Sequence, residues 1–159
     1  MTKPSTPVHF DWRRPHHWLA FGFGSGLLPK APGTWGTLVG IPFFLLLSSL
    51  PLAGYLLATL ALFGLGVWVC GKVGRELGVH DHPAIVWDEV VGYLVTMTAV
   101  PVDWGWLLGG FLLFRLFDIL KPWPVRWFDR RVPGGVGVMA DDLVAGLMAL
   151  AVLQVVLVL

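Results

Sequence analysis

The stretch HDHPAIVWDEVVGYLVTMTAV, residues 80–100, indicates the fold class of this chain. Two adjacent carboxylates, Asp88 and Glu89, stand directly before residues 90–102, a run that contains no charged side chain. Neighbouring positions on a helix point about 100° apart, so both acids cannot face lipid without a large cost. The pattern predicts a helix embedded in a membrane, with an acidic pair at its entrance.

The composition of the whole chain supports a membrane protein. Of its 159 residues, 56% are hydrophobic and 13% are charged, and the mean hydropathy is +0.74. Soluble domains carry about 25% charged residues, and a domain of this size has a large surface to cover. The net charge of +1 gives no indication of a nucleic-acid partner, and the single cysteine excludes an intramolecular disulfide. We therefore predict an all-α, polytopic membrane helical bundle.

Hydropathy divides the chain into a polar N-terminal arm, residues 1–17, and a single membrane-embedded domain, residues 18–159. The arm has no hydrophobic core of the signal-peptide type, so we expect insertion through internal spans without cleavage. Residues 18–28 are apolar but glycine-rich, which predicts a re-entrant or interfacial segment. The rest of the domain should form four to five short spans. The candidate spans are residues 36–50, 52–71, 85–102, 104–120 and 143–159.

Positive charges predict how these spans are oriented. Lysine and arginine precede the first span and follow the second and fourth, whereas the connections after the first and third contain neither. The positive-inside rule then places the N-terminus and the charged connections in the cytoplasm. Acidic residues from separate spans should consequently meet at the cytoplasmic membrane face. These residues are Asp81, Asp88, Glu89, Asp118, Asp141 and Asp142, with Lys121 beside them.

The acidic pairs also allow a structural interpretation. Asp88 and Glu89 could open an interfacial helix and be favoured by its dipole, although residues 84–87 before them look helical. Asp141 and Asp142 could open the last helix, one of them as its N-cap. Acids that converge from different spans would repel one another unless a cation is bound. We therefore favour a shared metal site.

A third charged group lies at the end of the fourth span. Arg115, Asp118 and Lys121 recur every three residues, which places them on one helical face. Arg115 lies inside the apolar span, where ionisable residues are usually functional. Alternatively, Arg115 and Asp118 form an intrahelical ion pair while Lys121 reaches to the interface. We expect Arg115, and Arg126 beyond the following prolines, to bind phosphate.

The segment GFGSGLLPKAPGTWGT, residues 22–37, is a further candidate for phosphate binding. A glycine-rich loop that leads into a helix offers free backbone amides, to which Lys30 and Thr34 could add donors. The segment lacks the GK[ST] of a Walker A motif, and a re-entrant turn with a threonine cap is the alternative. For His16 and His17, in the polar arm, we expect no more than interfacial contacts.

Carboxylates, lysine and arginine that meet at a membrane face indicate phosphate chemistry on a lipid. Oxygen ligands suit Mg²⁺, which bridges carboxylates and phosphate oxygens. Either an aspartate or a metal-bound water could be the nucleophile. An alternative function is a divalent-cation or proton transporter that uses the same carboxylates, but transport requires polar residues across the whole bilayer.

Four blocks of the sequence resemble those of phosphatidylglycerophosphatase A, in the same order and spacing, over residues 18–146. They are GFGSGLLPKAPGTWGT (22–37), HDHPAIVWDEVVG (80–92), FRLFDILKPWPVRWFDR (114–130) and GGVGVMADDLVAG (134–146). The resemblance implies a magnesium-dependent phosphatase of the bacterial inner membrane that converts phosphatidylglycerophosphate to phosphatidylglycerol and inorganic phosphate. Its motif acids fall on the six predicted metal ligands named above, and its basic residue falls on Lys121. The expected catalytic group is then Asp88, Glu89, Asp118, Lys121 and Asp142.

Overall fold

The computed structural model describes residues 8–159, and every regular element in that range is helical. The all-α prediction is therefore confirmed for the described part of the chain, while residues 1–7 of the predicted arm lie outside it. The elements are α1 (Pro15–Ala20), the 3-10 helix η1 (Gly22–Leu27), α2 (Pro32–Leu47), α3 (Leu52–Leu77), α4 (Trp87–Thr96), α5 (Trp104–Leu120), α6 (Val125–Arg131) and α7 (Gly134–Val158).

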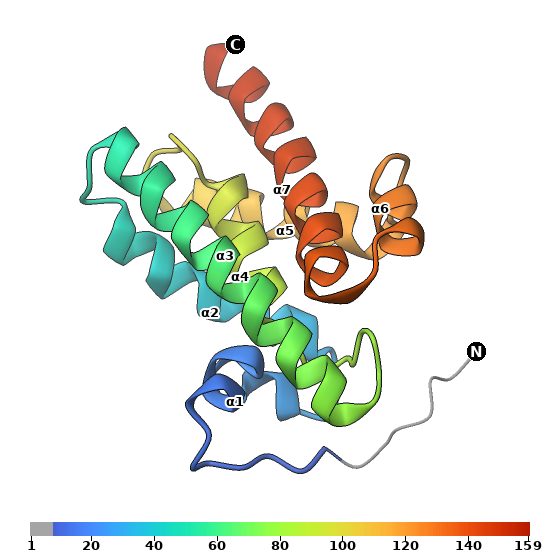
Figure 1. Cartoon of the computed structure of the whole chain (residues 1–159). Coiled ribbons are helices and arrows are strands. Elements are labelled where there is room, and N and C mark those ends of the chain that lie inside the picture. Colours follow the sequence, from blue (N-terminus) through green and yellow to red (C-terminus); the bar gives the residue numbers. More distant parts are fainter. Residues whose placement is uncertain (1–7) are drawn as a thin grey trace.

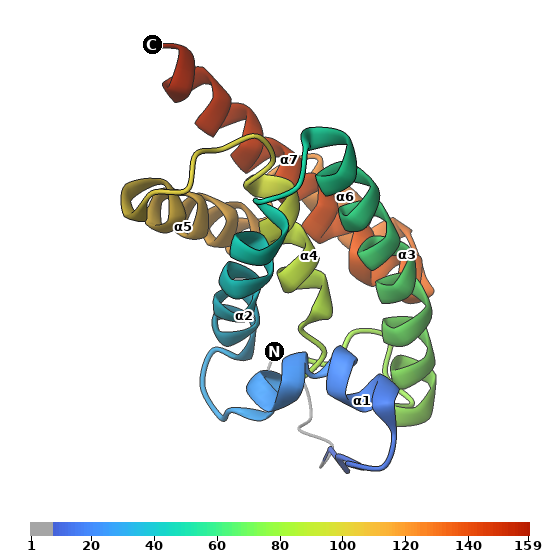
Figure 2. The ribbon, with the colours of Figure 1, turned by 90° about the vertical axis from the view of Figure 1, so that its left-hand side faces the viewer.

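The short helix α4 lies at the centre of the bundle (Figure 2), and all but one of its residues are buried. It packs against α2, α3, α5 and α7. Its first turn contributes Trp87 to a hydrophobic cluster with α3 and the start of α7. Its second half contributes Tyr93 and Leu94 to another cluster with α5 and the middle of α7. Asp88, in the first turn of α4, is thus enclosed by packing, while Glu89 beside it is the one residue of the helix that is partly exposed.

Two of the described helices, α3 and α7, are long and apolar enough to cross a membrane. Their 26 and 25 residues correspond to about 39 and 37 Å at the helical rise. Only 22% and 33% of their most apolar segments are buried, whereas a soluble protein's core helix is mostly buried. α2 and α5 have 16 and 17 residues, and α4 has 10. The prediction of four to five spans is therefore not confirmed.

The helix boundaries agree with the predicted spans in one case. α5 covers the predicted residues 104–120. α3 extends beyond the predicted residue 71 to Leu77. The helix continues through Gly71 and Gly74 and ends at Gly78, which caps it in the left-handed conformation with φ of +67°. α4 is shorter than predicted, since Val86 is its N-cap. The helical interpretation of residues 84–87 is wrong for all but Trp87.

The largest correction concerns the last helix. α7 begins at Gly134 and not at residue 143, so Asp141 and Asp142 lie two turns inside it and neither is an N-cap. The predicted span began after the glycines of this segment, but Gly135 is already helical and packs directly on α3. A Cβ on Gly135 would lie 2.8 Å from the backbone nitrogen of Gly71. The missing side chain permits this approach and carries both aspartates into the bundle.

The glycine-rich N-terminal segment forms short helical turns at one end of the bundle (Figure 1). α1 packs against α3, and η1 packs against α2. Each has six residues, too few to cross a membrane. Residues 18–28, predicted as a re-entrant or interfacial segment, therefore cover the end of the bundle where α3 finishes and α4 begins.

Candidate active site

Three carboxylates from two helices converge near the start of α4. Asp88 and Glu89 come from its first turn, and Asp142 comes from the third turn of α7. One oxygen from each of these three side chains lies within 4.8 Å of the other two. Asp88 and Asp142 are 7% and 3% exposed. The predicted meeting of acids from separate helices is thus present in the structure.

Each of these three carboxylates has an oxygen that is buried without a hydrogen-bond partner among the described residues, and so has the neighbouring Asp141. The oxygens are Asp88 Oδ1, Glu89 Oε2, Asp142 Oδ2 and Asp141 Oδ1. An unpaired buried carboxylate oxygen is costly, and neighbouring carboxylates also repel one another. Hard divalent cations take oxygen ligands of this kind. The donor set and its unpaired oxygens therefore fit a magnesium ion.

Arg115 connects α5 to this acidic group. Its Nη1 donates to the Asp118 carboxylate, which is the intrahelical pair of the alternative interpretation, and lies 3.9 Å from Glu89 Oε1. The side chains of all three residues are less than one-sixth exposed. Asp118 is close enough to interact electrostatically with Glu89 and with Asp142. The pair is therefore part of the site and is not an isolated feature of α5.

Lys121 ends α5 in the left-handed conformation and turns its ammonium towards α7. Its Nζ donates to Asp141 Oδ2 at 2.8 Å and to Asp129 Oδ1, on α6, at 2.6 Å. Burial acts to lower the pKa of Lys121, but the charges and hydrogen bonds of Asp141 and Asp129 outweigh it and raise that pKa above its usual range. Lys121 is consequently a fixed cation that joins three helices.

The N-terminus of α2 reaches the same site through Gly33. A Cβ on this residue would lie 2.5 Å from Glu89 Oε1 and 2.9 Å from Arg115 Nη1. The helix has no side-chain cap, and Thr37 donates to Gly33 O at 2.8 Å within the helix, so the predicted threonine cap is absent. Thr34, in the first turn, is partly buried. Its phosphate-binding role stays a prediction.

The other predicted residues lie around this centre. Lys30 is exposed on the loop before α2. Arg126 is exposed on α6 and, with Lys121, lines a cavity of about 400 Å³. Asp81 lies in the loop between α3 and α4, outside the group of three, and is close enough to Asp141 for the two to interact electrostatically.

Sequence reasoning missed two contributors to this site. Asp129 is eight residues from Lys121, and only the chain reversal at Pro122 and Pro124 brings the two together. Gly33 was one glycine among several in its segment, and nothing in the pattern identified its position against Glu89. A proline-bounded turn next to a charged helix end was the available signal for Asp129.

Comparison with known proteins identifies the family of this chain. Residues 18–157 match the family model described as phosphatidylglycerophosphatase A. The chain belongs to this family. It is a phosphatase, a phosphoric monoester hydrolase, and its family implies a phospholipid substrate.

The relatives cover most of the chain. It is 49% identical to phosphatidylglycerophosphatase A of Escherichia coli K12 over 140 residues, which are 87% of this chain and 81% of the relative. It is 49% identical to the protein of the same name from Haemophilus influenzae Rd over 154 residues, or 96% and 94%. A putative phosphatidylinositol-3-phosphatase of Bacteroides thetaiotaomicron is 41% identical over 145 residues, or 86% and 90%. No solved structure matches the chain.

Proposed function

We propose that this phosphatase hydrolyses phosphatidylglycerophosphate to phosphatidylglycerol and inorganic phosphate, with Mg²⁺, at the cytoplasmic face of the bacterial inner membrane. The substrate is the one named for the family and for two relatives. The observation that supports the metal is the group of unpaired, buried oxygens on Asp88, Glu89 and Asp142.

These three residues would hold the metal ion, with Asp81, Asp118 and Asp141 as the wider predicted set. Bound there, Mg²⁺ would offset the negative charge of the carboxylates and polarise a phosphoryl oxygen. The surrounding residues supply the rest of the site. Arg115 lies beside Glu89 and can stabilise charge on the transferring phosphoryl group, while the Gly33 amide in the first turn of α2 can donate to its oxygens.

Lys121 and Arg126 are placed to bind the anionic headgroup of the substrate. Lys121 holds Asp141 in place next to Asp142, and it also lines the cavity on α6 together with Arg126. An anionic headgroup in that cavity would lie against both cations. Lys30 and Thr34 are the remaining candidate phosphate ligands; Lys30 lies on the loop before α2, and Thr34 follows Gly33 in the first turn of that helix.

The orientation of the site follows from the charged connections. The loop after α2 contains no lysine or arginine, whereas the segment 121–131 contains four positive residues and adjoins the site. A topology reporter fused after Leu50 should indicate a periplasmic position, and one fused after Arg131 should indicate a cytoplasmic position. The opposite pattern of reporter activity would contradict a cytoplasmic site.

The direct test is phosphate release by the purified full-length protein in mixed micelles of detergent and phosphatidylglycerophosphate. We expect release with Mg²⁺ and a loss of at least about 100-fold after chelation, restored by added Mg²⁺. Absence of release with Mg²⁺ would refute the substrate, while full activity in chelator would refute the metal. The alternative of a cation or proton transporter predicts Mg²⁺-linked uptake into liposomes, and no feature of the described chain favours it over the phosphatase.

Lys121→Met should lower the rate of phosphate release by roughly 10- to 100-fold, because Asp141 and Asp129 lose their shared cation. The matched control is Lys72→Met, which removes an α3 lysine that lies over the Trp68 ring, away from the acidic site. Equal rates in the two variants would show that Lys121 has no part in catalysis or phosphate binding. Helix content by circular dichroism should be the same for both.

A further inference from the structure

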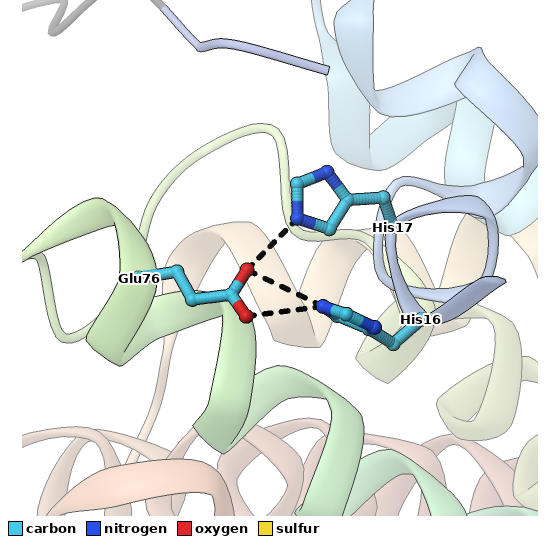
Figure 3. A group of neighbouring side chains, drawn as sticks. All are labelled: His16, His17 and Glu76. Carbon is cyan, nitrogen blue, oxygen red and sulfur yellow. Dashed lines mark hydrogen bonds and ion pairs between the residues drawn. The ribbon is translucent and has the colours of Figure 1, made fainter. Parts of the chain in front are cut away.

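A second group of potential ligands lies outside the phosphatase site, where α1 meets the end of α3 (Figure 3). His16 and His17 both direct Nε2 towards the carboxylate of Glu76. His16 Nε2 lies 3.1 Å from Glu76 Oε1, and His17 Nε2 lies 2.9 Å from Glu76 Oε2. Sequence analysis expected no more than interfacial contacts from these two histidines. Their burial beside a shared carboxylate contradicts that expectation.

The geometry of the three side chains suits a transition-metal ion. Zinc binds imidazole nitrogen at about 2.0–2.1 Å and carboxylate oxygen at about 2.0–2.2 Å, so ligand atoms in its tetrahedral shell are roughly 3.3 Å apart. The histidine nitrogens lie 2.9–3.3 Å from the Glu76 oxygens, close to that spacing, and one donor atom from each residue falls within 4.8 Å of the others. Two imidazoles and one carboxylate favour zinc or cobalt over Mg²⁺, which prefers oxygen ligands.

Packing fixes both rings in this orientation. The side chains of His16 and His17 are only 10% and 5% exposed, and their rings are nearly perpendicular at 85°. The His17 ring packs edge-on against Phe21, and the His16 ring packs against Trp68. Glu76 is more open, with 27% of its side chain exposed, so a fourth ligand position can be filled by water. The two nitrogen donors are therefore held in place by the fold.

Two contacts with residues outside the group would have to change when an ion binds. Arg14 Nη1 lies 3.3 Å from Glu76 Oε2, but the Arg14 side chain is half exposed and can turn into solvent. The Asp11 amide donates to His17 Nδ1 at 3.2 Å, which places the proton of a neutral His17 on Nε2. Binding through Nε2 moves that proton to Nδ1 and releases the Asp11 amide. Within the group, bonds to the ion replace the Nε2 hydrogen bonds of both histidines to Glu76.

We propose that His16, His17 and Glu76 bind one zinc-class divalent cation, which fastens α1 to the end of α3 and is distinct from the magnesium site. Each of the two sites draws its ligands from different helices. The acidic site uses α4 and α7, and the histidine site uses α1 and α3. The histidine site would hold the cover formed by α1 and η1 in position over the bundle.

The test is titration of the purified full-length protein with Co²⁺ in excess Mg²⁺, followed by visible absorption. Tetrahedral sites with nitrogen ligands give a strong cobalt spectrum, whereas Mg²⁺ occupies the oxygen-only site. We expect one equivalent of Co²⁺ to bind, to be displaced by Zn²⁺, and to bind at least about 10-fold more weakly to Glu76→Gln and His16→Gln. Asp88→Asn, in the acidic site, is the matched control and should bind Co²⁺ like the unaltered protein.

Three outcomes would overturn the proposal. In the first, the unaltered protein shows no saturable cobalt absorption. In the second, Glu76→Gln and His16→Gln bind Co²⁺ as tightly as the unaltered protein. In the third, only Asp88→Asn loses Co²⁺ binding. The first two would leave His16, His17 and Glu76 as a hydrogen-bonded tether only, and the third would assign the ion to the acidic site. Circular dichroism of each variant separates lost ligation from lost folding, and His17→Gln provides a further variant if one of the others fails to fold.

Discussion

Asp88→Asn and Asp142→Asn should each lower the rate of phosphate release by at least about 100-fold while leaving the protein folded. Both side chains are buried and contribute unpaired oxygens to the proposed metal site. The amide has nearly the same shape as the carboxylate but no charge, so it binds a divalent cation poorly. The measurement is phosphate release from phosphatidylglycerophosphate at saturating Mg²⁺.

Stability separates this expectation from a structural role for the same residues. In the absence of metal, removing one of several buried carboxylates relieves repulsion, so each variant should unfold at a temperature equal to or above that of the unaltered protein. If the aspartates served mainly to hold the fold, both variants would instead unfold at a lower temperature. Thermal unfolding in chelator, followed by circular dichroism, distinguishes the two.

Asp103→Asn is the matched control. Asp103 is exposed at the N-cap of α5, where its Oδ1 accepts a hydrogen bond from the Gly105 amide at 2.9 Å. Asparagine serves about equally well at an N-cap, so activity and stability should both be unchanged. A rate for Asp88→Asn and Asp142→Asn equal to that of Asp103→Asn would disprove the shared-metal site.

The convergence of the acids could be predicted from sequence because it depends only on the alternation of charged and uncharged connections along the chain. Charged connections recur after every second predicted span, which predicts that the acids next to them gather at one end of the bundle. The meeting of Asp88, Glu89 and Asp142 agrees with that prediction, although the structure does not confirm four to five spans. α5 was also predictable at both ends, since Asp103 caps its start and Pro122 follows its last turn.

The features that sequence could not give depend on a partner elsewhere in the chain. A glycine ends a helix in one context and permits close helix packing in another, so the start of α7 at Gly134 required knowledge of α3. The contact of His16 and His17 with Glu76 spans about sixty residues of sequence. Local periodicity contains no information about such a pairing. These are tertiary contacts, and no pattern within one element predicts them.

Gly33→Ala tests a contact that only the structure reveals, and we expect it to lower the rate of phosphate release by about 100-fold. The added methyl would press on Glu89 Oε1 at 2.5 Å and on Arg115 Nη1 at 2.9 Å. Both atoms end flexible side chains, so they can move aside while the backbone of α2 stays in place. A displacement of roughly 1 Å at a reacting centre can reduce the rate by about that factor.

The helix itself should tolerate this change, because alanine is a better helix former than glycine by about 1 kcal/mol in an exposed helix interior. Gly64→Ala, in the middle of α3, is the matched control, since its Cβ would meet nothing within 4 Å. Normal activity in Gly64→Ala and a large loss in Gly33→Ala, with both proteins folded, would place the start of α2 in the reaction centre. Normal activity in both would instead show that Glu89 and Arg115 can move without consequence, and the proposed contact of the phosphoryl group with Arg115 and the Gly33 amide would then be wrong.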